Sequence, residues 1–380
     1  MFSIATIHLV KRYTKSKSTP FVLHKNFMSE KVTITDVARK AGVSLSTVSN
    51  LLNGRSKRMR PSTEQRIIEA IEELGFTPNQ AARQLKTGHS AILGLIVPSV
   101  ANPFYGIFAR HVESAALRLG YQVLLGNSDR DPAREFKYAE ELWGYGVRGL
   151  IFGSSLLQLS HFENLISKGL HVVAFERPAQ ETDGVRVDSV GIDNQLAARL
   201  ATKHLLSLGH KRIGFLSGPI QTVSRLDRLS GYQSALREAN IQSDPKLVWD
   251  VSPTGTSYGD ADAVDLGRQG TQELLSRPNP PTAIFAINDM FAFGAYAGAK
   301  DLGLKIPDDL SVVGVDDITL TEIIQPSLTT VRQPIEQIAN IAVARLVARL
   351  AGTFVEEQDH QILAPQLIVR SSTAIAPNRI

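Results

Sequence analysis

The sequence has no cysteine among its 380 residues, so disulfide bonds, thiolate metal sites and cysteine nucleophiles are excluded. No apolar run reaches the roughly 18 residues that a membrane-spanning helix needs. The apolar segment Ser3–Val10 is short and follows no basic region, which makes it a poor signal peptide. We therefore expect a cytoplasmic protein.

Residue patterns typical of catalysis are also missing. The nine histidines show no metal-ligand spacing with carboxylates, and no nucleophile elbow is present. The run Gly144-x-Gly146-x-x-Gly149 has the form of a dinucleotide-binding fingerprint. It follows a predicted helix and precedes a predicted strand, which is the reverse of the context that this motif requires. We therefore expect no enzyme activity, no metal ion and no cofactor.

The positive charge is concentrated at the N-terminal end. The whole chain carries +4, whereas residues 1–30 carry +4, residues 31–89 carry +5 and the remainder carries −5. A basic end joined to a mildly acidic body predicts that this end binds a phosphate backbone, although a solvated basic surface is the simpler alternative. Residues 1–30 are rich in Ser and Thr and show no hydrophobic periodicity, which predicts a disordered basic tail.

Two short helices around a tight turn are predicted between residues 32 and 54. Thr33 and Asp36 form a capping-box-like start, and Gly42 ends the first helix because glycine tolerates a positive φ angle. Ser44 is in place to cap the second helix. The apolar residues that we expect to face inward are Val37, Ala38 and Ala41 in the first helix and Val48, Leu51 and Leu52 in the second.

The outward face of the second helix keeps small or polar residues, which leaves its surface approachable. A third helix begins at Pro61 with Ser62 in place to cap it, and an apolar stripe closes a three-helix core before Gly75. That stripe consists of Ile67, Ile68, Ile71 and Leu74. Two helices with a glycine-containing turn form a helix-turn-helix pattern, although an ordinary αα-hairpin can have much the same sequence.

The string TDVARKAGVSLSTVSNLLNG closely resembles the headpiece of the lactose-repressor (LacI/GalR-type) family of transcriptional regulators. The resemblance implies a DNA-binding headpiece over residues 31–77 and a hinge helix over residues 78–89. In that hinge, Leu85 is the residue that would enter the minor groove and open a base step, and the flanking Arg83 and Lys86 agree with this interpretation. A plain linker with an incidental leucine is the alternative.

The same resemblance implies which headpiece residues touch DNA. Leu45, Ser46 and Asn50 match the base-contacting positions of the family. Many relatives have Arg or His at the position of Asn50. Because Arg prefers guanine whereas Asn pairs with the N6 and N7 atoms of adenine, we expect an operator that departs from the usual half-site at that base pair. The residues that match phosphate-contacting positions are Thr33, Ser44, Thr47, Ser49 and Asn53.

From Ala91 onward, short β-rich runs alternate with helical stretches, which predicts α/β lobes with parallel sheets built from βαβ units. This part resembles the two-lobed, type I periplasmic-binding-protein-like core of the same family. The implied N-terminal lobe takes residues 90–187 plus 334–352, and the implied C-terminal lobe takes residues 188–333 plus 353–372. The β-rich runs are AILGLIVP, YQVLLGNS, VRGLIFGS, HVVAFER, KRIGFLSG, TAIFAIND and LSVVGVDD.

Ligands in such folds lie beyond the carboxyl ends of the strands, and this rule selects the effector candidates. Phe104 and Tyr105 follow the first strand and can stack on a sugar or a base, although buried aromatic residues are more often part of a core. Ser224 and Arg228 are four residues apart and share a helical face. The resemblance implies that Arg228 is the effector-binding arginine, whereas a surface arginine is the alternative. The remaining candidates are Asn288 and Asp316, which end apolar strands, and the weaker Thr222, Val251 and the turn 154–156.

These patterns predict a homodimeric, sequence-specific DNA-binding transcription regulator, most simply a repressor, on a near-palindromic operator. A small-molecule effector, a sugar or sugar derivative bound between the lobes, would control operator affinity. One rival is a solute-binding protein, which would need an export signal and no basic headpiece. The other is a doubly wound α/β enzyme, which would need a glycine fingerprint between strand and helix. The sequence leaves open whether the effector is an inducer or a co-repressor, and whether the protein is a dimer or a tetramer.

Overall fold

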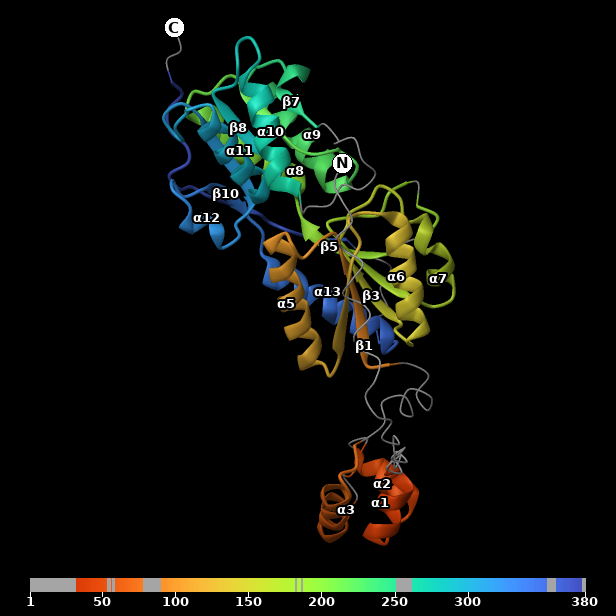
Figure 1. Cartoon of the computed structure of the whole chain (residues 1–380). Helices are drawn as coiled ribbons and strands as arrows, with labels where there is room; N and C mark the ends of the chain where they lie inside the picture. The colour runs from red at the N-terminus through yellow and green to blue at the C-terminus, as the bar shows by residue number, and fades with distance from the viewer. Residues whose placement is uncertain are drawn as a thin grey trace, which may run out of the picture. The chain divides into compact units, whose positions relative to one another are not determined.

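The computed structural model describes residues 32–52, 56, 59–77, 90–181, 183–185, 187–250, 262–353 and 360–377. The chain divides into two units, residues 1–83 and 84–380 (Figure 1). The predicted tail, the predicted hinge helix with Leu85, Asn53 and the effector candidate Val251 lie outside the described residues. Within the described ranges, no helix has the length and apolarity needed to cross a bilayer.

The first unit is a three-helix headpiece over its described residues. The predicted capping box is confirmed, because the Asp36 N–H donates to Thr33 Oγ1 at 3.4 Å and the Thr33 N–H donates to Asp36 Oδ2 at 2.9 Å. Gly42 ends the first helix with a φ angle of 63°. The helices are α1 (Ile34–Ala41), α2 (Leu45–Leu52) and α3 (Pro61–Leu74). Their buried core consists of Val37, Ala38, Ala41, Val48, Ile67, Ala70 and Phe76.

Two predicted details of α3 are wrong. The N-cap residue is Arg60, because Pro61 takes the first helical position, where its fixed φ angle is suitable, and Ser62 already lies inside the helix. Ile68 is 38% exposed and lies outside the apolar stripe. Ala70 takes its place, because residues three and four apart share a face of a helix and Ile67 already sets the direction of that face.

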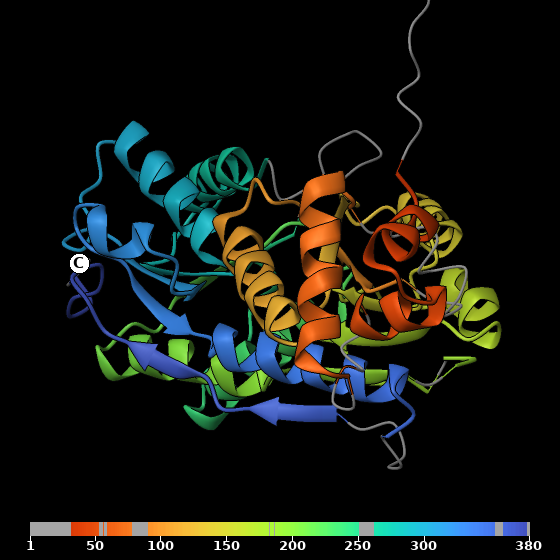
Figure 2. The ribbon, with the colours of Figure 1, turned by 90° about the horizontal axis from the view of Figure 1, so that it is seen from below.

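The first lobe of the second unit is built on a six-stranded sheet of order β11-β5-β4-β3-β1-β2, in which all neighbours are parallel. Helices α5 and α13 pack side by side against this sheet (Figures 1 and 2). The strands are β1 (Ile92–Val97), β2 (Gln122–Asn127), β3 (Gly149–Phe152), β4 (His171–Phe175), β5 (Asp188–Ile192) and β11 (His360–Leu363). The helices are α5 (Pro103–Arg118), α6 (Pro132–Gly144), α7 (Glu163–Ser167) and α13 (Ile335–Leu350).

The second lobe is built on a six-stranded sheet of order β12-β10-β9-β8-β6-β7, in which β12 is antiparallel to β10 and the other neighbours are parallel. The strands are β6 (Ile213–Leu216), β7 (Val248–Trp249), β8 (Ala283–Ala286), β9 (Ser311–Asp316), β10 (Thr329–Arg332) and β12 (Gln366–Ile368). The helices are α8 (Asn194–Ser207), α9 (Val223–Glu238), α10 (Ala263–Leu275), α11 (Asp289–Asp301) and the short α12 (Leu320–Ile323). The predicted α/β class with two parallel-sheet lobes is therefore confirmed.

The predicted lobe boundaries are wrong at two strands, β5 and β11. Both lie in residues that the sequence assigned to the C-terminal lobe, yet β5 pairs with β4 in the first sheet and β11 pairs with β5. The chain passes between the lobes after β5, after β10 and after β11. Figure 2 shows β11 and β12 following one another across this boundary. The sequence placed the crossings incorrectly because a strand's sheet is decided by partners distant along the chain.

The C-terminal segment is held to the second lobe by two imidazoles, of which His210 is buried and His204 is half-buried. His210 is 1% exposed, and its Nε2 donates to the Ala374 carbonyl at 3.1 Å while its Nδ1 lies 2.8 Å from Thr282 Oγ1. His204 Nε2 lies 2.9 Å from Thr373 Oγ1. Burial lowers the pKa of both histidines below the ordinary value of 6.5. Both are therefore neutral in the folded protein over a wider pH range than in the unfolded chain.

We predict that the substitution His210→Asn reduces the loss of stability in acid. Because the folded-state pKa of His210 is depressed, the unfolded chain takes up the proton first, and stability is lost as the pH falls below about 6.5. Urea unfolding of both proteins at pH 7.5 and pH 5.5 measures the effect, and groups common to both cancel in the comparison. An equal loss of stability in the two proteins would contradict the prediction.

Candidate functional site

A buried guanidinium joins three segments of the second unit. Arg228 on α9 is 5% exposed, and its Nε donates to Asn194 Oδ1 at 2.8 Å. Its Nη1 donates to the Ile287 carbonyl at 2.7 Å, and its Nη2 donates to Glu176 Oε1 at 3.2 Å. Glu176 follows β4 of the first lobe, whereas the other two acceptors belong to the second lobe. Arg228 therefore ties the two lobes together at the carboxyl ends of their strands.

Glu176 reaches this position through an unusual backbone conformation. Its φ angle is 54°, in the left-handed region, and it is 7% exposed. Gly191 on β5 leaves the space, because a Cβ there would lie 2.9 Å from the Cα of Glu176. Burial raises the pKa of the Glu176 carboxyl, although the charge of Arg228, hydrogen bonds from Asn194 and Arg228, and the charge of Arg130 oppose this. The carboxyl is therefore closer to protonation than an exposed one.

Asp316 supplies a second buried carboxyl to the same place. It ends β9 with a φ angle of 124° and accepts a hydrogen bond from Gln333 Nε2 at 2.9 Å. Burial raises its pKa well above the ordinary value, the charge of Arg228 opposes the rise, and the carboxyls of Asp289 and Glu176 add to it. The predicted candidates Arg228 and Asp316 are thus brought together with Glu176, which the sequence reasoning missed.

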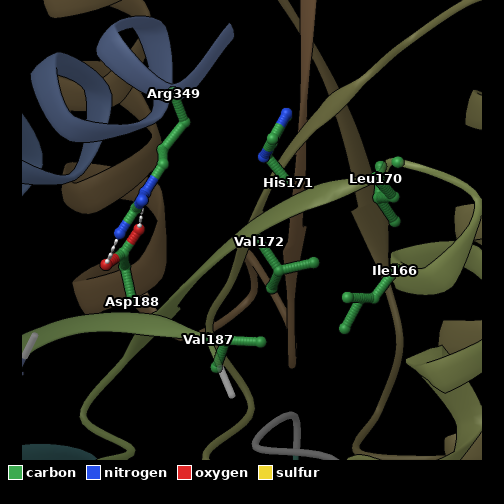
Figure 3. Close-up of a pocket in the computed structure, with 8 residues that line it drawn as sticks. Ile166, Leu170, His171, Val172, Val187, Asp188 and Arg349 are labelled. Atoms are coloured by element: carbon green, nitrogen blue, oxygen red, sulfur yellow. Dashed lines mark hydrogen bonds and ion pairs between the residues drawn. The ribbon is translucent and has the colours of Figure 1, made fainter. Parts of the chain in front are cut away.

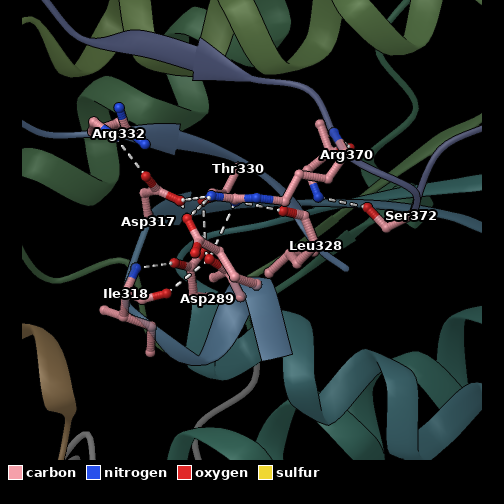
Figure 4. Close-up of polar contacts among 11 residues, drawn as sticks. Asp289, Asp317, Ile318, Leu328, Thr330, Arg332, Arg370 and Ser372 are labelled. Atoms are coloured by element: carbon pink, nitrogen blue, oxygen red, sulfur yellow. Dashed lines mark hydrogen bonds and ion pairs between the residues drawn. The ribbon is translucent and has the colours of Figure 1, made fainter. Parts of the chain in front are cut away.

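A polar network behind Asp316 supports the strand ends (Figure 4). Asp289 is fully buried and accepts hydrogen bonds from Thr330 Oγ1 at 2.5 Å and from the Ile318 N–H at 3.1 Å. Burial raises its pKa to about 7. The neighbouring Asp317 pairs with Arg332 at 2.6 Å and Arg370 at 2.7 Å. Asp317 therefore holds the loop that follows β9.

The predicted Asn288 has a capping role in this network. Its Oδ1 accepts a hydrogen bond from the Phe291 N–H at 3.0 Å and so caps α11. The side chain is 7% exposed. Its amide group remains a candidate donor for a ligand, because the cap uses only the carbonyl oxygen.

The predicted aromatic pair lies on the first-lobe side. Phe104 and Tyr105 begin α5 and pack edge to face with centroids 5.2 Å apart, and Phe104 also stacks on Phe175 at 5.9 Å. The Tyr105 hydroxyl accepts a hydrogen bond from Arg130 Nη2 at 3.2 Å. Phe104 is thus mainly a core residue, whereas the Tyr105 hydroxyl and Arg130 bring polar groups toward Glu176.

Thr222 and Ser224 lie at a contact between the two lobes. The Ser155 carbonyl accepts a hydrogen bond from the Val223 N–H at 2.9 Å, and Ser155 Oγ accepts one from the Ser224 N–H at 3.2 Å. Leu156 and Thr222 form an isolated antiparallel bridge beside them. We call residues 155–156 together with residues 222–224 the interlobe clasp. Thr222 also caps α9, because its Oγ1 accepts a hydrogen bond from the Arg225 N–H.

A separate hollow of about 260 Å³ lies at the opposite ends of β4 and β5 (Figure 3). Its polar side is formed by Asp188 and Arg349, which pair at 2.8 and 3.0 Å. Burial and the charge of Arg349 lower the pKa of the adjoining His171. None of the predicted effector residues lines this hollow. The site around Arg228 is therefore the stronger ligand candidate.

The headpiece places most of the predicted DNA-contacting residues at the start of α1 or along α2. Leu45 is 50% exposed, and Ser46 and Asn50 are exposed beside it. Ser44 Oγ accepts a hydrogen bond from the Thr47 N–H at 3.2 Å, which confirms the predicted cap of α2. Thr33 is exposed and Ser49 is half-buried, while Asn53 and Leu85 fall in ranges outside the description.

Sequence reasoning missed Glu176, Asn194, Arg130 and Gln333. Glu176 follows an apolar strand as Asp316 does, so the same strand-end signal could have found it. The other three carry no local signal. Asn194 and Gln333 lie at lobe crossings, and Arg130 follows β2 with a φ angle of 55°.

Comparison with known proteins covers both units. The family model described as "Bacterial regulatory proteins, lacI family" matches residues 33–79, and that described as "Periplasmic binding protein-like domain" matches residues 202–373. The HTH-type transcriptional regulator DegA of Bacillus subtilis is 35% identical over 347 residues, which cover 90% of this chain and 98% of that protein.

Two solved structures are similar over nearly the whole chain. The Lac repressor dimer bound to operator and the anti-inducer ONPF gives a TM-score of 0.78 at 28% identity and covers 91% of this chain and 100% of that one. The complex of the transcriptional regulator CelR with cellobiose gives a TM-score of 0.64 at 30% identity and covers 90% and 99%.

We predict that Arg228→Met destabilises the protein by about 3 kcal/mol or more, because it leaves a buried carboxyl without its cation. The loss is larger at pH 8 than at pH 6, since removing the guanidinium raises the pKa of Glu176 further and protonation at the lower pH relieves the cost. Urea unfolding at both pH values measures this. The double variant Arg228→Met/Glu176→Gln should depend less on pH, and an equal dependence would contradict the assignment.

Proposed function

The chain belongs to the lacI family of bacterial regulatory proteins, and from that premise we propose that its α2 face reads an operator while its Arg228 site binds an uncharged, polyhydroxylated effector. As a member of this family the chain is a DNA-binding transcription regulator and not an enzyme. The observation that carries the effector proposal is the ring of buried donors and acceptors around Arg228, supplied by both lobes.

The DNA-binding part of the proposal rests on the exposed side chains of α2 and on charge. Leu45, Ser46 and Asn50 are accessible for base edges, and residues 31–89 carry +5 against −5 for the rest of the chain beyond them. The basic residues of segment 55–60 and the N–H groups at helix starts are the phosphate contacts that we propose. Because the related Lac repressor structure is a dimer on its operator, we propose a homodimer of this chain on a near-palindromic site.

We predict that Asn50→Arg changes the base preferred at one position of each half-site from adenine toward guanine, because the guanidinium forks onto guanine O6 and N7. Selection of bound sequences from a random duplex pool measures the preference. The control is Gln65→Arg on the exposed face of α3, which adds the same charge away from α2. It should strengthen binding without changing the preferred base. An unchanged preference with Asn50→Arg would refute the base-contacting role.

The effector part rests on matched hydrogen-bonding types. Arg228 and Arg130 offer only donors, whereas the carboxyl groups of Glu176 and Asp316 offer acceptor oxygens. A hydroxyl group both donates and accepts, so adjacent hydroxyls of one molecule can satisfy both sets at once. A phosphate or carboxylate ligand would place its negative charge beside the carboxyls of Glu176 and Asp316, which disfavours such a ligand unless these carboxyls take up protons. The relative that was solved with cellobiose agrees with this class of ligand.

Linkage between the two sites follows from the position of Glu176. An effector that binds Arg228 and Glu176 together changes the free energy of the contact between the lobes. If bound effector changes operator affinity by a given factor, bound operator changes effector affinity by the same factor. The sign depends on whether the effector favours the DNA-binding arrangement or its alternative, so both an inducer and a co-repressor are compatible with this site.

We predict that in a thermal-shift screen of full-length protein a neutral sugar raises the melting temperature, whereas ribose 5-phosphate and gluconate do not. A ligand at 100 times its Kd stabilises by about 2.7 kcal/mol. Arg228→Lys should abolish the shift because ammonium cannot reproduce the guanidinium fork. The control Arg349→Lys, which changes a residue outside the group around Arg228, should retain it. Stabilisation by the charged compounds alone would contradict the proposed ligand class.

A further inference from the structure

Arg177 is a fully buried cation that the proposed function does not use. Its exposed fraction is 0%, and it forms a bidentate pair with Asp183, with Nη1 to Oδ2 at 2.7 Å and Nη2 to Oδ1 at 2.6 Å. Asp183 also accepts the Gln180 N–H at 2.8 Å. Burial raises the pKa of Asp183, yet the hydrogen bonds from Arg177 and Gln180 and the charge of Arg177 hold it below its ordinary value. The pair is therefore ionised.

The other donors of Arg177 reach the turn that carries the interlobe clasp. Its Nε donates to the Leu156 carbonyl at 2.5 Å, and its Nη2 also donates to the Leu157 carbonyl at 3.0 Å. The carbonyl of the preceding Glu176 accepts Ser155 Oγ at 2.8 Å. Ser155 has a φ angle of 53°, which residues other than glycine rarely adopt, so the turn depends on such support.

The interlobe clasp also supplies hydrogen-bond acceptors to the first N–H groups of α9. The first N–H groups of a helix have no partner within the helix, and here those of Val223 and Ser224 donate to Ser155 across the lobe boundary. Since α9 also carries Arg228, a correctly placed Ser155 holds the helix that supplies the effector-binding guanidinium. A continuous series of contacts thus runs to α9 from Asp183 through Arg177, the Leu156 carbonyl and Ser155.

We propose that Arg177 is a positioning residue for lobe closure, which holds the 155–157 turn where it can receive the N–H groups of α9. Arg177 makes its contacts with Asp183 and the turn and not with the ring of groups around Arg228. It acts by raising the population of closed lobes, and the apparent affinity of any ligand for the closed form scales with that population. The effect of Arg177 on effector affinity rests on the proposed function, whereas its effect on the distance between the lobes does not.

The test measures the lobe separation in the full-length protein without ligand. The chain has no cysteine, so spin labels can be attached to cysteines introduced at Glu140 of α6 and Arg237 of α9, which are both exposed. When the labelled protein is diluted with an excess of unlabelled protein, pairs within one chain dominate, and electron spin resonance reports the interlobe distance distribution even in a homodimer. The double variant Arg177→Met/Asp183→Leu removes both charges together and leaves no unpaired buried ion. We expect its distribution to broaden and shift to longer separations than that of the wild type.

A matched control is available in the same lobe. Arg349 and Asp188 also form a bidentate pair, but at the start of β5 and away from the clasp (Figure 3). Arg349→Met/Asp188→Leu should leave the distance distribution as in the wild type. Arg177→Lys keeps the charge opposite Asp183 but lacks the fork, so it should produce a partial shift.

An unchanged distribution in the folded Arg177→Met/Asp183→Leu protein would overturn the proposal, and so would an equal shift in the control. If the double variant does not fold, the distance distribution of Arg177→Lys is compared with that of the wild type instead. Identical distributions would then overturn the proposal. A DNA footprint recorded on the same samples distinguishes the two hypotheses. Its absence in every protein would count against the proposed function and leave the distance result intact.

Discussion

The guanidinium of Arg228 is a buried charge whose hydrogen bonds must be satisfied in every state of the protein. It takes acceptors from Asn194, Ile287 and Glu176, and only Glu176 belongs to the first lobe. Opening the lobes removes that acceptor, so water or a ligand must replace it. The energetic cost of an unpaired buried ion therefore makes ligand occupancy and lobe arrangement parts of one equilibrium.

The parallel arrangement of both sheets explains why these groups meet at all. Parallel strands point their carboxyl ends to one edge, and in this chain Glu176 and Asp316 both follow strands at such edges. Positive φ angles of 54° and 124° let these two residues leave the strand direction. Gly191 provides the room for Glu176, and Gly314 provides room for the neighbouring Asp289, since a Cβ at Gly314 would lie 2.3 Å from Asp289 Oδ1. The site is therefore built by backbone geometry as much as by side-chain identity.

Apart from the cap and one stripe position of α3, the sequence predicts what is decided locally, and it misses what is decided across the chain. The capping box at Thr33, the stop at Gly42 and the cap at Ser44 involve residues within four positions of one another, and all three agree with the structure. All seven predicted β-rich runs contain strands. The crossings between the lobes leave no periodic signal in the sequence. These crossings decide which sheet β5 and β11 join, and they bring together Glu176 and Arg228, which are 52 residues apart.

Glu176 and Arg177 are consecutive residues with different partners, and this adjacency connects the groups around Arg228 to the interlobe clasp. The Glu176 side chain faces Arg228, its carbonyl accepts Ser155 Oγ, and Arg177 holds the carbonyls of the same turn. A displacement of the Glu176 side chain by a ligand is transmitted through one rigid peptide plane to the turn that holds α9. Buried, close-packed groups of this kind have few alternative arrangements, so such a displacement is resolved by a change between discrete lobe positions rather than by local adjustment.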